Sequence, residues 1–584
     1  NLSAGGTSTA TDGLTGSGAL NINGGDLAIS GANSGLSGQT LIASGASATL
    51  NGAGTLGSSA INVLGDLNLN GANAAFGNVL SGSGDINTNA AVTLTGINSF
   101  SGAHHIGAAG ALTVTQASNL GASTATVDLE TATSHLVLNG LSGAVANALS
   151  GVAGSTVDIN NGAAVSLTGN NSGFSGQYAL ADSSTLTVGS TNNLGVAASI
   201  ALAGAQDILA LSGFSGTFTN TVTGNGILQV TDSSNVTLTS SNDVDNAVTV
   251  DITNATLNLA DIALFDHALT GSGTLNVAKN DASTAFDFGS SVGGAFSGMV
   301  NLTNSTFALS AGNTAALANA TLQLSANNVT TVGTDDRTLH GLDLSGGTLI
   351  FDGAAPQSQA SGVVTVTDLA LNSGTISVTG TDSWTNQNPA IAPNVSILDQ
   401  DRGDIMLELI NANSVTGSAN DLDLMINGTS VTSGTQGVIS SILQGGTAVA
   451  NATHNYGLTS SNGSGGTGLY VNYSLSALAL LTDDADALLL ATDSSASSNK
   501  VLNALVSGVG GLQIDATNGA LTLANGNNSY QGKTRVNGGE LILGANGAFG
   551  ATSLLDIASG ASANINGHTQ TVGALTNAGT LTLG

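Results

Sequence analysis

The sequence contains no cysteine, three prolines and very few basic residues. Because no disulfide can form, we expect the stability of this chain to come from backbone pairing. Six lysine and arginine residues stand against 36 aspartate and glutamate residues, and the formal net charge is −30 at pH 7. Since phosphate binding needs clusters of basic side chains, this balance argues against nucleic acid and anionic lipid as partners.

Aromatic residues and long hydrophobic runs are also scarce. Aromatic residues make up 3% of the chain and charged residues 7%. A single large core depends on bulky side chains, so this composition favours many small cores stacked along the chain. No run of about 18 apolar residues is present, and the sequence therefore predicts no membrane-spanning helix. Hydrophobic residues nevertheless make up 41% of the chain and alternate regularly, which argues against disorder.

A polar turn followed by a short alternating segment recurs along the chain. The clearest copy occupies residues 527–550, and weaker copies begin at Asn33, Asn98 and Asn171. In each weaker copy a serine precedes the leucine of a Leu-Gly pair by 19 residues: Ser37 and Leu56, Ser101 and Leu120, Ser175 and Leu194. Copies that keep their spacing while their residues change indicate a repeated structural unit.

Short alternating segments bounded by glycine, asparagine or serine predict strands throughout the chain. Leu20 and Ile22, for example, alternate with Asn21 and Asn23. A sandwich, a propeller and a parallel β-solenoid all suit such a pattern. The distance between repeats changes from 64 to 74 residues, which a solenoid tolerates and a closed propeller does not. We therefore predict an all-β fold, a parallel β-helix (solenoid) that forms an elongated rod with on the order of 25 turns.

The composition changes in the second half of the chain. The single tryptophan, Trp384, and two of the three prolines occur close together, and acidic residues become more frequent. We predict a parallel β-helix stem over residues 1–382. An irregular region or subdomain on the β-helix follows over 383–474, and further β-helix turns occupy 475–584.

The segment 515–584 resembles the autotransporter-associated β-strand repeat. That repeat has a Tyr-x-Gly-x-Thr turn before a strand and a Gly-Gly-x-Leu turn after it, matched here by residues 530–534 and 538–541. The whole chain is similar to the passenger of an AIDA-type autotransporter, secreted by the type V route of Gram-negative bacteria. The resemblance implies a right-handed parallel β-helix and a C-terminal β-barrel in the outer membrane. We expect that translocator barrel to lie outside these 584 residues and to be the only contact with the membrane.

The same resemblance implies a non-catalytic adhesin on the cell surface. Passengers of this family act in adhesion, autoaggregation and biofilm formation. We therefore expect self-association with the same protein on neighbouring cells, with a host matrix protein or glycan as a further partner. Two alternatives remain open. One is a β-helix carbohydrate-active enzyme, a lyase or a glycosidase, and the other is a passive stalk that displays a missing N-terminal domain.

Two kinds of candidate binding residue stand out. Arg402, Gly403 and Asp404 form a tripeptide that could mimic an integrin ligand in an exposed loop. Closely spaced acidic residues could hold calcium, which prefers oxygen ligands. The candidate calcium ligands are Asp399, Asp401, Asp483, Asp484 and Asp486. We expect no other cofactor.

The remaining candidates for chemistry are weaker. Asp335 with Asp336, and Asp243 with Asp245, could form the acid pair of a glycosidase, but acids at such spacing are more often solvated surface residues. A lyase acting on an acidic sugar would need basic residues, which are few and scattered. His104 and His105 are adjacent, so in a strand they point to opposite faces and cannot readily share one metal ion. We therefore expect no enzymatic activity.

Overall fold

The computed structural model describes residues 7–11, 13–52, 54–71, 73–241, 243–352, 362–379, 383–385, 397–401, 405–431, 438–492 and 498–584. The fold is almost entirely β, with 53% strand and 4% helix. The chain forms two compact units, one comprising Asn1–Asn280 and Phe288–Val300 and the other Asp281–Asp287 and Asn301–Gly584. Together they contain about 25 turns of parallel β-solenoid, which confirms the predicted fold class.

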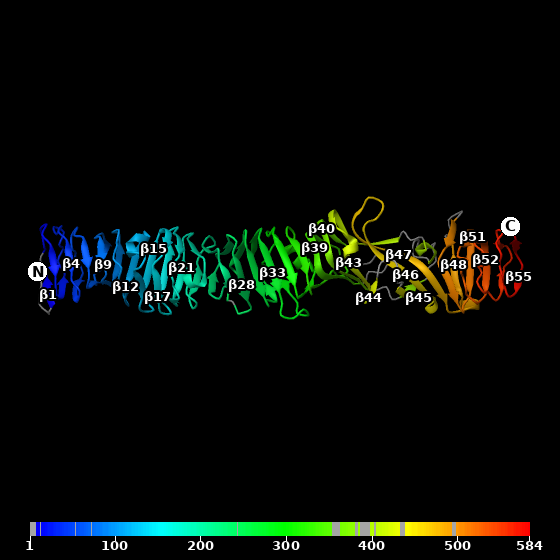
Figure 1. The fold of residues 1–584 in the computed structure, drawn as a ribbon, viewed down its shortest axis with the longest axis horizontal. Coiled ribbons are helices and arrows are strands. Elements are labelled where there is room, and N and C mark those ends of the chain that lie inside the picture. The colour runs from blue at the N-terminus through cyan, green and yellow to red at the C-terminus, as the bar shows by residue number, and fades with distance from the viewer. Residues whose placement is uncertain are drawn as a thin grey trace. The chain divides into compact units, whose positions relative to one another are not determined.

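In the first unit each turn adds one strand to each of several parallel sheets (Figure 1). The strands of a nine-stranded sheet are β1 (Thr7–Ala10), β3 (Gly25–Ile29), β5 (Ala46–Leu50), β7 (Asp66–Leu69), β10 (Asp85–Thr88), β12 (Ala103–Ile106), β14 (Thr126–Leu129), β17 (Ala148–Gly151) and β20 (Gly173–Phe174). Those of an eight-stranded sheet are β8 (Asn73–Phe76), β11 (Ala91–Leu94), β13 (Ala111–Val114), β15 (His135–Asn139), β18 (Thr156–Asn160), β21 (Gln177–Leu180), β23 (Ser199–Leu202) and β26 (Thr221–Gly224).

Further parallel sheets complete the turns of this unit. A seven-stranded sheet contains β16 (Ser142–Val145), β19 (Ala164–Leu167), β22 (Thr185–Val188), β24 (Ile208–Ser212), β27 (Ile227–Thr231), β29 (Thr249–Ile252) and β32 (Leu269–Gly271). A four-stranded sheet contains β2 (Leu20–Ile22), β4 (Thr40–Ile42), β6 (Ile61–Val63) and β9 (Leu80–Gly82). The remaining elements are η1 (Ala117–Leu120), η2 (Thr191–Asn193), β25 (Ser215–Thr217), β28 (Asn235–Thr239), β30 (Thr256–Ala260), β31 (Leu264–Phe265) and β33 (Thr274–Ala278).

The second unit contains longer strands, such as β39 (Arg337–Phe351) and β40 (Val364–Val378). β34 (Asp287–Phe288) and β35 (Met299–Thr303) contain residues of both units. The next elements are β36 (Thr306–Ala308), α1 (Ala311–Ala316), β37 (Thr321–Ser325), β38 (Val329–Thr331), β39 (Arg337–Phe351), β40 (Val364–Val378), β41 (Ser383–Thr385), α2 (Ile397–Gln400), β42 (Ile405–Gly417), η3 (Ala419–Asp421), β43 (Leu422–Ile426), β44 (Thr429–Val431), β45 (Val438–Gln444), β46 (Thr447–Ser461) and β47 (Thr467–Leu480).

The C-terminal turns of this unit form a separate, eight-stranded sheet. Its strands are β48 (Leu488–Ala491), β49 (Ser498–Leu502), β51 (Leu512–Leu523), β52 (Thr534–Leu543), β53 (Leu555–Ile557), β54 (Ser562–Asn564), β55 (Leu575–Asn577) and β56 (Thr580–Thr582). The remaining elements are η4 (Asp484–Asp486) and β50 (Leu505–Gly508), and β50 pairs with β47.

Antiparallel pairing appears within residues 405–480. β46 pairs antiparallel with both β45 and β47, and β42 pairs antiparallel with β47. This segment overlaps the region in which the composition changes, although the boundaries predicted at 382 and 474 remain predictions.

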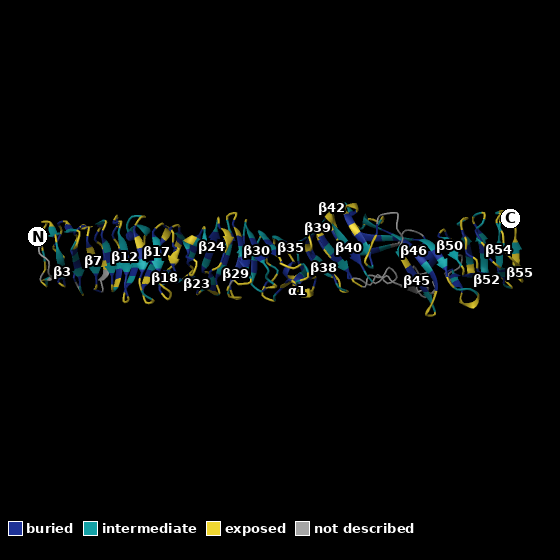
Figure 2. Cartoon of the chain, turned by 60° about the horizontal axis from the view of Figure 1, so that its bottom comes forward, coloured by how far each residue is buried: buried dark blue, intermediate teal, exposed yellow. Residues whose placement is uncertain are grey.

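Alternation along each strand builds the core. In the nine-stranded sheet the inward positions stack in register from turn to turn and are buried: Leu67, Ile86, His104, Val127 and Leu149. Figure 2 shows this alternation of buried and partly exposed positions along the strands. Each fully buried aliphatic side chain contributes roughly 1.5–3 kcal/mol relative to an exposed one. Many small increments therefore replace the bulky core that the sequence lacks.

A buried asparagine lies at the start of the repeated segment found in the sequence. The side-chain NH₂ of Asn171 donates to the carbonyl oxygen of Asn193 on the next turn, at 2.5 Å. Its side-chain oxygen accepts from the backbone N–H of Leu149 on the preceding turn, at 2.7 Å. Asn98 and Asn528 make the same pair of bonds. These asparagines therefore tie three successive turns together where the chain bends between strands.

Candidate binding surface

Outward side chains of the nine-stranded sheet form a hydrogen-bonded row, which we call the polar ladder: Asp26, Ser47, Thr49, Asn68 and Asn87. Ser47 Oγ and Thr49 Oγ1 each donate to Asp26 Oδ1 at 2.8 Å. Asn68 Nδ2 donates to Thr49 Oγ1 at 3.1 Å, and Asn87 Nδ2 donates to Asn68 Oδ1 at 2.8 Å. Parallel in-register pairing stacks these side chains, because Thr49, Asn68 and Asn87 are direct strand partners.

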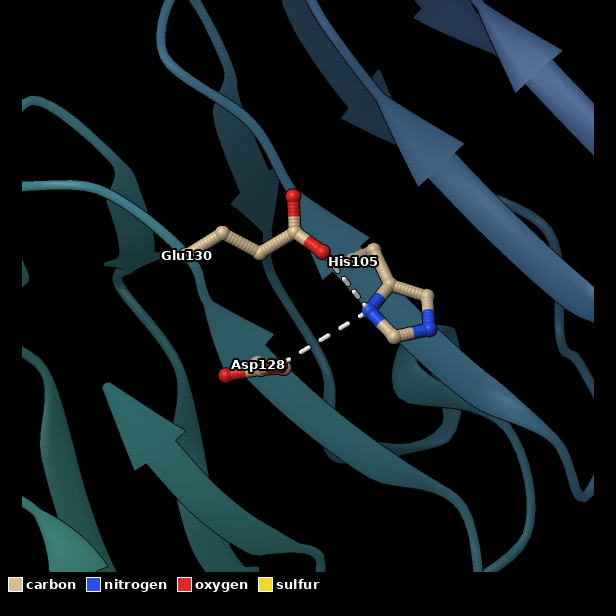
Figure 3. Close-up of side chains that lie close together, drawn as sticks. All are labelled: His105, Asp128 and Glu130. Carbon is tan, nitrogen blue, oxygen red and sulfur yellow. Dashed lines mark ion pairs between the residues drawn. The ribbon is translucent and has the colours of Figure 1, made fainter. Parts of the chain in front are cut away.

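The row of outward side chains continues from Asn87 to His105, its direct partner on β12. His105 is paired in turn with Asp128 on β14, and Glu130 follows two residues later. His105 Nδ1 lies 3.7 Å from Asp128 Oδ2 and 3.1 Å from Glu130 Oε1. Figure 3 shows both carboxylates directed at this nitrogen. The three side chains form a group that could hold a metal ion, and we call it the His-Asp-Glu cluster.

A second row of outward side chains lies further along the first unit. Asn258 Nδ2 donates to Asn235 Oδ1 at 2.6 Å, and Asn276 Nδ2 donates to Asn258 Oδ1 at 2.9 Å. Each bond links neighbouring parallel strands, β28 to β30 and β30 to β33. Stacked asparagine amides are therefore a recurrent feature of the solenoid surface.

Of the residues predicted to bind ligands, Arg402, Gly403 and Asp404 lie outside the described residues. Asp399 is buried and forms an ion pair with Lys500 at 2.6 Å.

Asp401 is also buried, and it accepts hydrogen bonds from the backbone of Asn503 and Ala504 at 2.6 and 2.9 Å. Burial raises the pKa of its carboxyl group. Asp399 and Asp401 therefore connect segments of the second unit that lie far apart in the sequence, and their partners are protein N–H and ammonium groups.

Of the other predicted calcium ligands, Asp483 and Asp484 lie beside basic residues. Lys533 and Arg535 both contact Asp484, with Arg535 Nη2 at 3.1 Å from Asp484 Oδ1. The hydrogen bond from Lys533 lowers the pKa of Asp484. Asp483 Oδ1 accepts from the backbone N–H of Lys533 at 3.0 Å, whereas Asp486 lies at the end of η4. Calcium would therefore have to displace protein cations at Asp484, and its binding there remains a prediction.

The acid pairs considered for a glycosidase make separate contacts. Asp335 pairs with Arg337 at 3.1 Å, and Asp336 Oδ1 accepts from the backbone N–H of Val363 at 2.9 Å. Asp245 lies 3.4 Å from the backbone nitrogen of Gly224, and Asp243 is exposed. Asp336 and Asp245 therefore contact backbone N–H groups, whereas Asp335 forms an ion pair with a side chain.

The predicted opposite orientation of the two adjacent histidines is confirmed. His104 is fully buried, and its Nε2 lies 2.8 Å from Thr88 Oγ1. Burial, with a smaller contribution from His105, lowers the pKa of His104 to about 3. His105 keeps 30% of its side chain exposed on the outer face. Asp128 and Glu130 could not be predicted from the sequence as partners of His105, because one turn of the chain separates them from it. Only the strand register brings the three residues together.

Comparisons with known proteins identify relatives without a described activity. No family model and no solved structure matches the chain. It is 33% identical over 348 residues to "Uncharacterized lipoprotein YdeK" of Escherichia coli (strain K12), covering 56% of this chain and 26% of the relative. It is 31% identical over 361 residues to "Uncharacterized protein YuaQ" of the same strain, covering 60% of this chain and 26% of the relative. The chain thus spans about a quarter of the length of these curated relatives.

Within the part of the chain that the structure describes, none of the helices has the length and apolar character required to cross a membrane.

Proposed function

We propose that this chain is the passenger of an AIDA-type autotransporter and holds neighbouring cells together by self-association, without catalysis. The observation that carries the proposal is the polar ladder on the parallel solenoid. Its amides and hydroxyls are already aligned by the strand register, so a second copy could contact a long row of equivalent groups. Single polar contacts are weak, but many identical contacts along two solenoids act together.

The charge of the chain is consistent with such association under physiological conditions. A net charge of −30 opposes contact between copies at low ionic strength. The Debye length is about 8 Å at physiological salt, so repulsion between distant surface charges is largely screened. Self-association should therefore strengthen as salt is added, which is the opposite of an interaction held by unlike charges.

A location on the cell envelope is part of the same proposal. One relative is described as a lipoprotein, which supports an envelope location for that protein and, by similarity, for this chain. We place the chain on the surface of a Gram-negative bacterium, anchored at the outer membrane by a C-terminal barrel outside the 584 residues.

Settling of bacteria that display the chain tests the proposal. Asn68→Glu combined with Asn87→Glu adds two charges to the polar ladder and should slow settling at least several-fold. Ser166→Glu combined with Thr187→Glu is the matched control, because these two residues are also direct partners at outward positions of a parallel sheet. The control should settle like the parent.

Equal settling of the ladder variant and the parent would contradict a role for the polar ladder. If parental cells do not settle but bind immobilised matrix protein or glycan, host attachment replaces self-association as the function. Absence of both activities would favour a passive stalk, and cleavage of a polysaccharide by the purified chain would favour an enzyme.

A further inference from the structure

The geometry points to a divalent transition-metal site at the His-Asp-Glu cluster, with Zn²⁺ as the best-fitting ion. In this site His105 Nδ1, Asp128 Oδ2 and Glu130 Oε1 are the protein ligands, and water takes the open position. This inference is independent of self-association, because it concerns three side chains on the first unit and requires no second copy.

The spacing of the ligand atoms suits a small tetrahedral ion. Ligands at about 2.0–2.2 Å from Zn²⁺ lie about 3.3–3.6 Å from one another in a tetrahedron. The two distances from His105 Nδ1, 3.1 Å to Glu130 and 3.7 Å to Asp128, bracket that range. All three ligand atoms lie within 4.8 Å of one another. A small adjustment of side-chain rotamers therefore suffices to bring them round one ion.

The donor set selects the class of metal. Calcium takes six to eight oxygen ligands, whereas imidazole nitrogen suits zinc and neighbouring transition metals. His105 Nδ1 is shielded from solvent and, among the described residues, makes no hydrogen bond of normal geometry despite its proximity to Glu130. A metal ion between the nitrogen and the carboxylates would satisfy all three groups.

A neighbouring turn orients one of the carboxylates. Ser150 Oγ donates to Asp128 Oδ1 at 2.9 Å, which directs the other oxygen, Oδ2, toward His105. Hydrogen bonds of this kind to a ligating carboxylate fix its orientation and commonly change metal affinity by about 10–100-fold. Ser150 is in register with Asp128, so the same strand stacking that builds the polar ladder positions this ligand.

The test is a Co²⁺ titration of the full 584-residue chain after removal of metal with a chelator. The parent should bind one equivalent with the visible absorption of tetrahedral Co²⁺, and Zn²⁺ should abolish that absorption. His105→Gln should weaken binding by at least about 100-fold, and Ser150→Ala by about 10-fold. Glu130→Gln provides a second ligand variant at a half-exposed side chain, where we expect the substitution to leave folding intact.

The matched control is His135→Gln, because His135 Nδ1 and Asp158 Oδ2 form a surface pair at 2.8 Å and have no third ligand among the described residues. This variant should bind Co²⁺ like the parent. The inference is overturned if the parent shows no one-equivalent site, or if His105→Gln and Glu130→Gln bind as tightly as the parent. Settling of displaying cells is measured separately, so failure of the metal site and failure of self-association are distinguishable.

Discussion

At the scale of single residues, stability comes from polar groups that span successive turns. Asn171 is buried and uses its side-chain oxygen and nitrogen on two different turns; the bond from Leu149 is buried and the bond to Asn193 is partly buried. A buried backbone group that loses its partner costs about 1–3 kcal/mol. The asparagines of the repeated segment therefore have a structural role.

Replacing Asn171 by alanine should lower the free energy of unfolding of the first unit by about 1–3 kcal/mol, because the N–H of Leu149 and the carbonyl of Asn193 lose their partners. Denaturant unfolding measures the change. Asn170→Ala is the control, since Asn170 is exposed and makes one local bond to the backbone of Ser172. Equal stability of the two variants would contradict the bridging role.

Gly195 follows Leu194, the leucine of the repeated Leu-Gly pair, and adopts a φ of +96°. A Cβ atom there would clash with the carbonyl oxygen of Phe174 on the preceding turn. Gly195→Ala should therefore destabilise the unit by more than the roughly 1–2 kcal/mol that a left-handed conformation costs an alanine. Thermal unfolding compares it with Gly162→Ala, which has a φ of +68° but open space around it. A Gly195 variant as stable as the Gly162 variant would argue against tight contact between turns.

At the scale of strands, alternation predicted strands with one inward and one outward face. The inward stack Ile86, His104 and Val127 shows this period of two. Strand register could not be predicted, since the chain between partners varies in length from turn to turn. The His-Asp-Glu cluster depends on that register, and so does the ion pair between Asp399 and Lys500, which is made across a long stretch of chain.

His454 on β46 gives the second unit a pH dependence. It packs against Tyr456 and Tyr473, and burial lowers its pKa to about 4 from an ordinary 6.5. Between those values the unfolded chain binds a proton that the folded chain does not. Stability is therefore complete above pH 6.5 and falls as the pH drops toward 4, by up to about 1.4 kcal/mol per pH unit.

Thermal unfolding at pH 7.5 and 5 checks this dependence. His454→Phe should reduce the loss of stability at low pH, because the aromatic packing is kept and the titrating group is removed. His340→Gln, at an exposed position of β39, should behave like the parent. If the parent and His454→Phe lose the same stability at pH 5, the buried imidazole is not the cause.

At the scale of the whole molecule, composition and repetition together predicted a parallel solenoid. The chain has few aromatic residues and no cysteine. Turns that each bury a few aliphatic residues need neither, because every turn covers the next. Outward positions of the first unit carry amides and hydroxyls in register, as in the polar ladder and the row formed by Asn235, Asn258 and Asn276. Such a surface favours many weak, identical contacts between copies.

The most direct measurement is the settling of bacteria that display the chain, with and without purified soluble chain, at low and physiological salt. Self-association predicts that displaying cells settle and that soluble chain inhibits settling in a dose-dependent way. It also predicts faster settling as salt screens the net charge of −30. Settling that is unaffected by soluble chain, or that weakens as salt is raised, would contradict self-association through the solenoid surface.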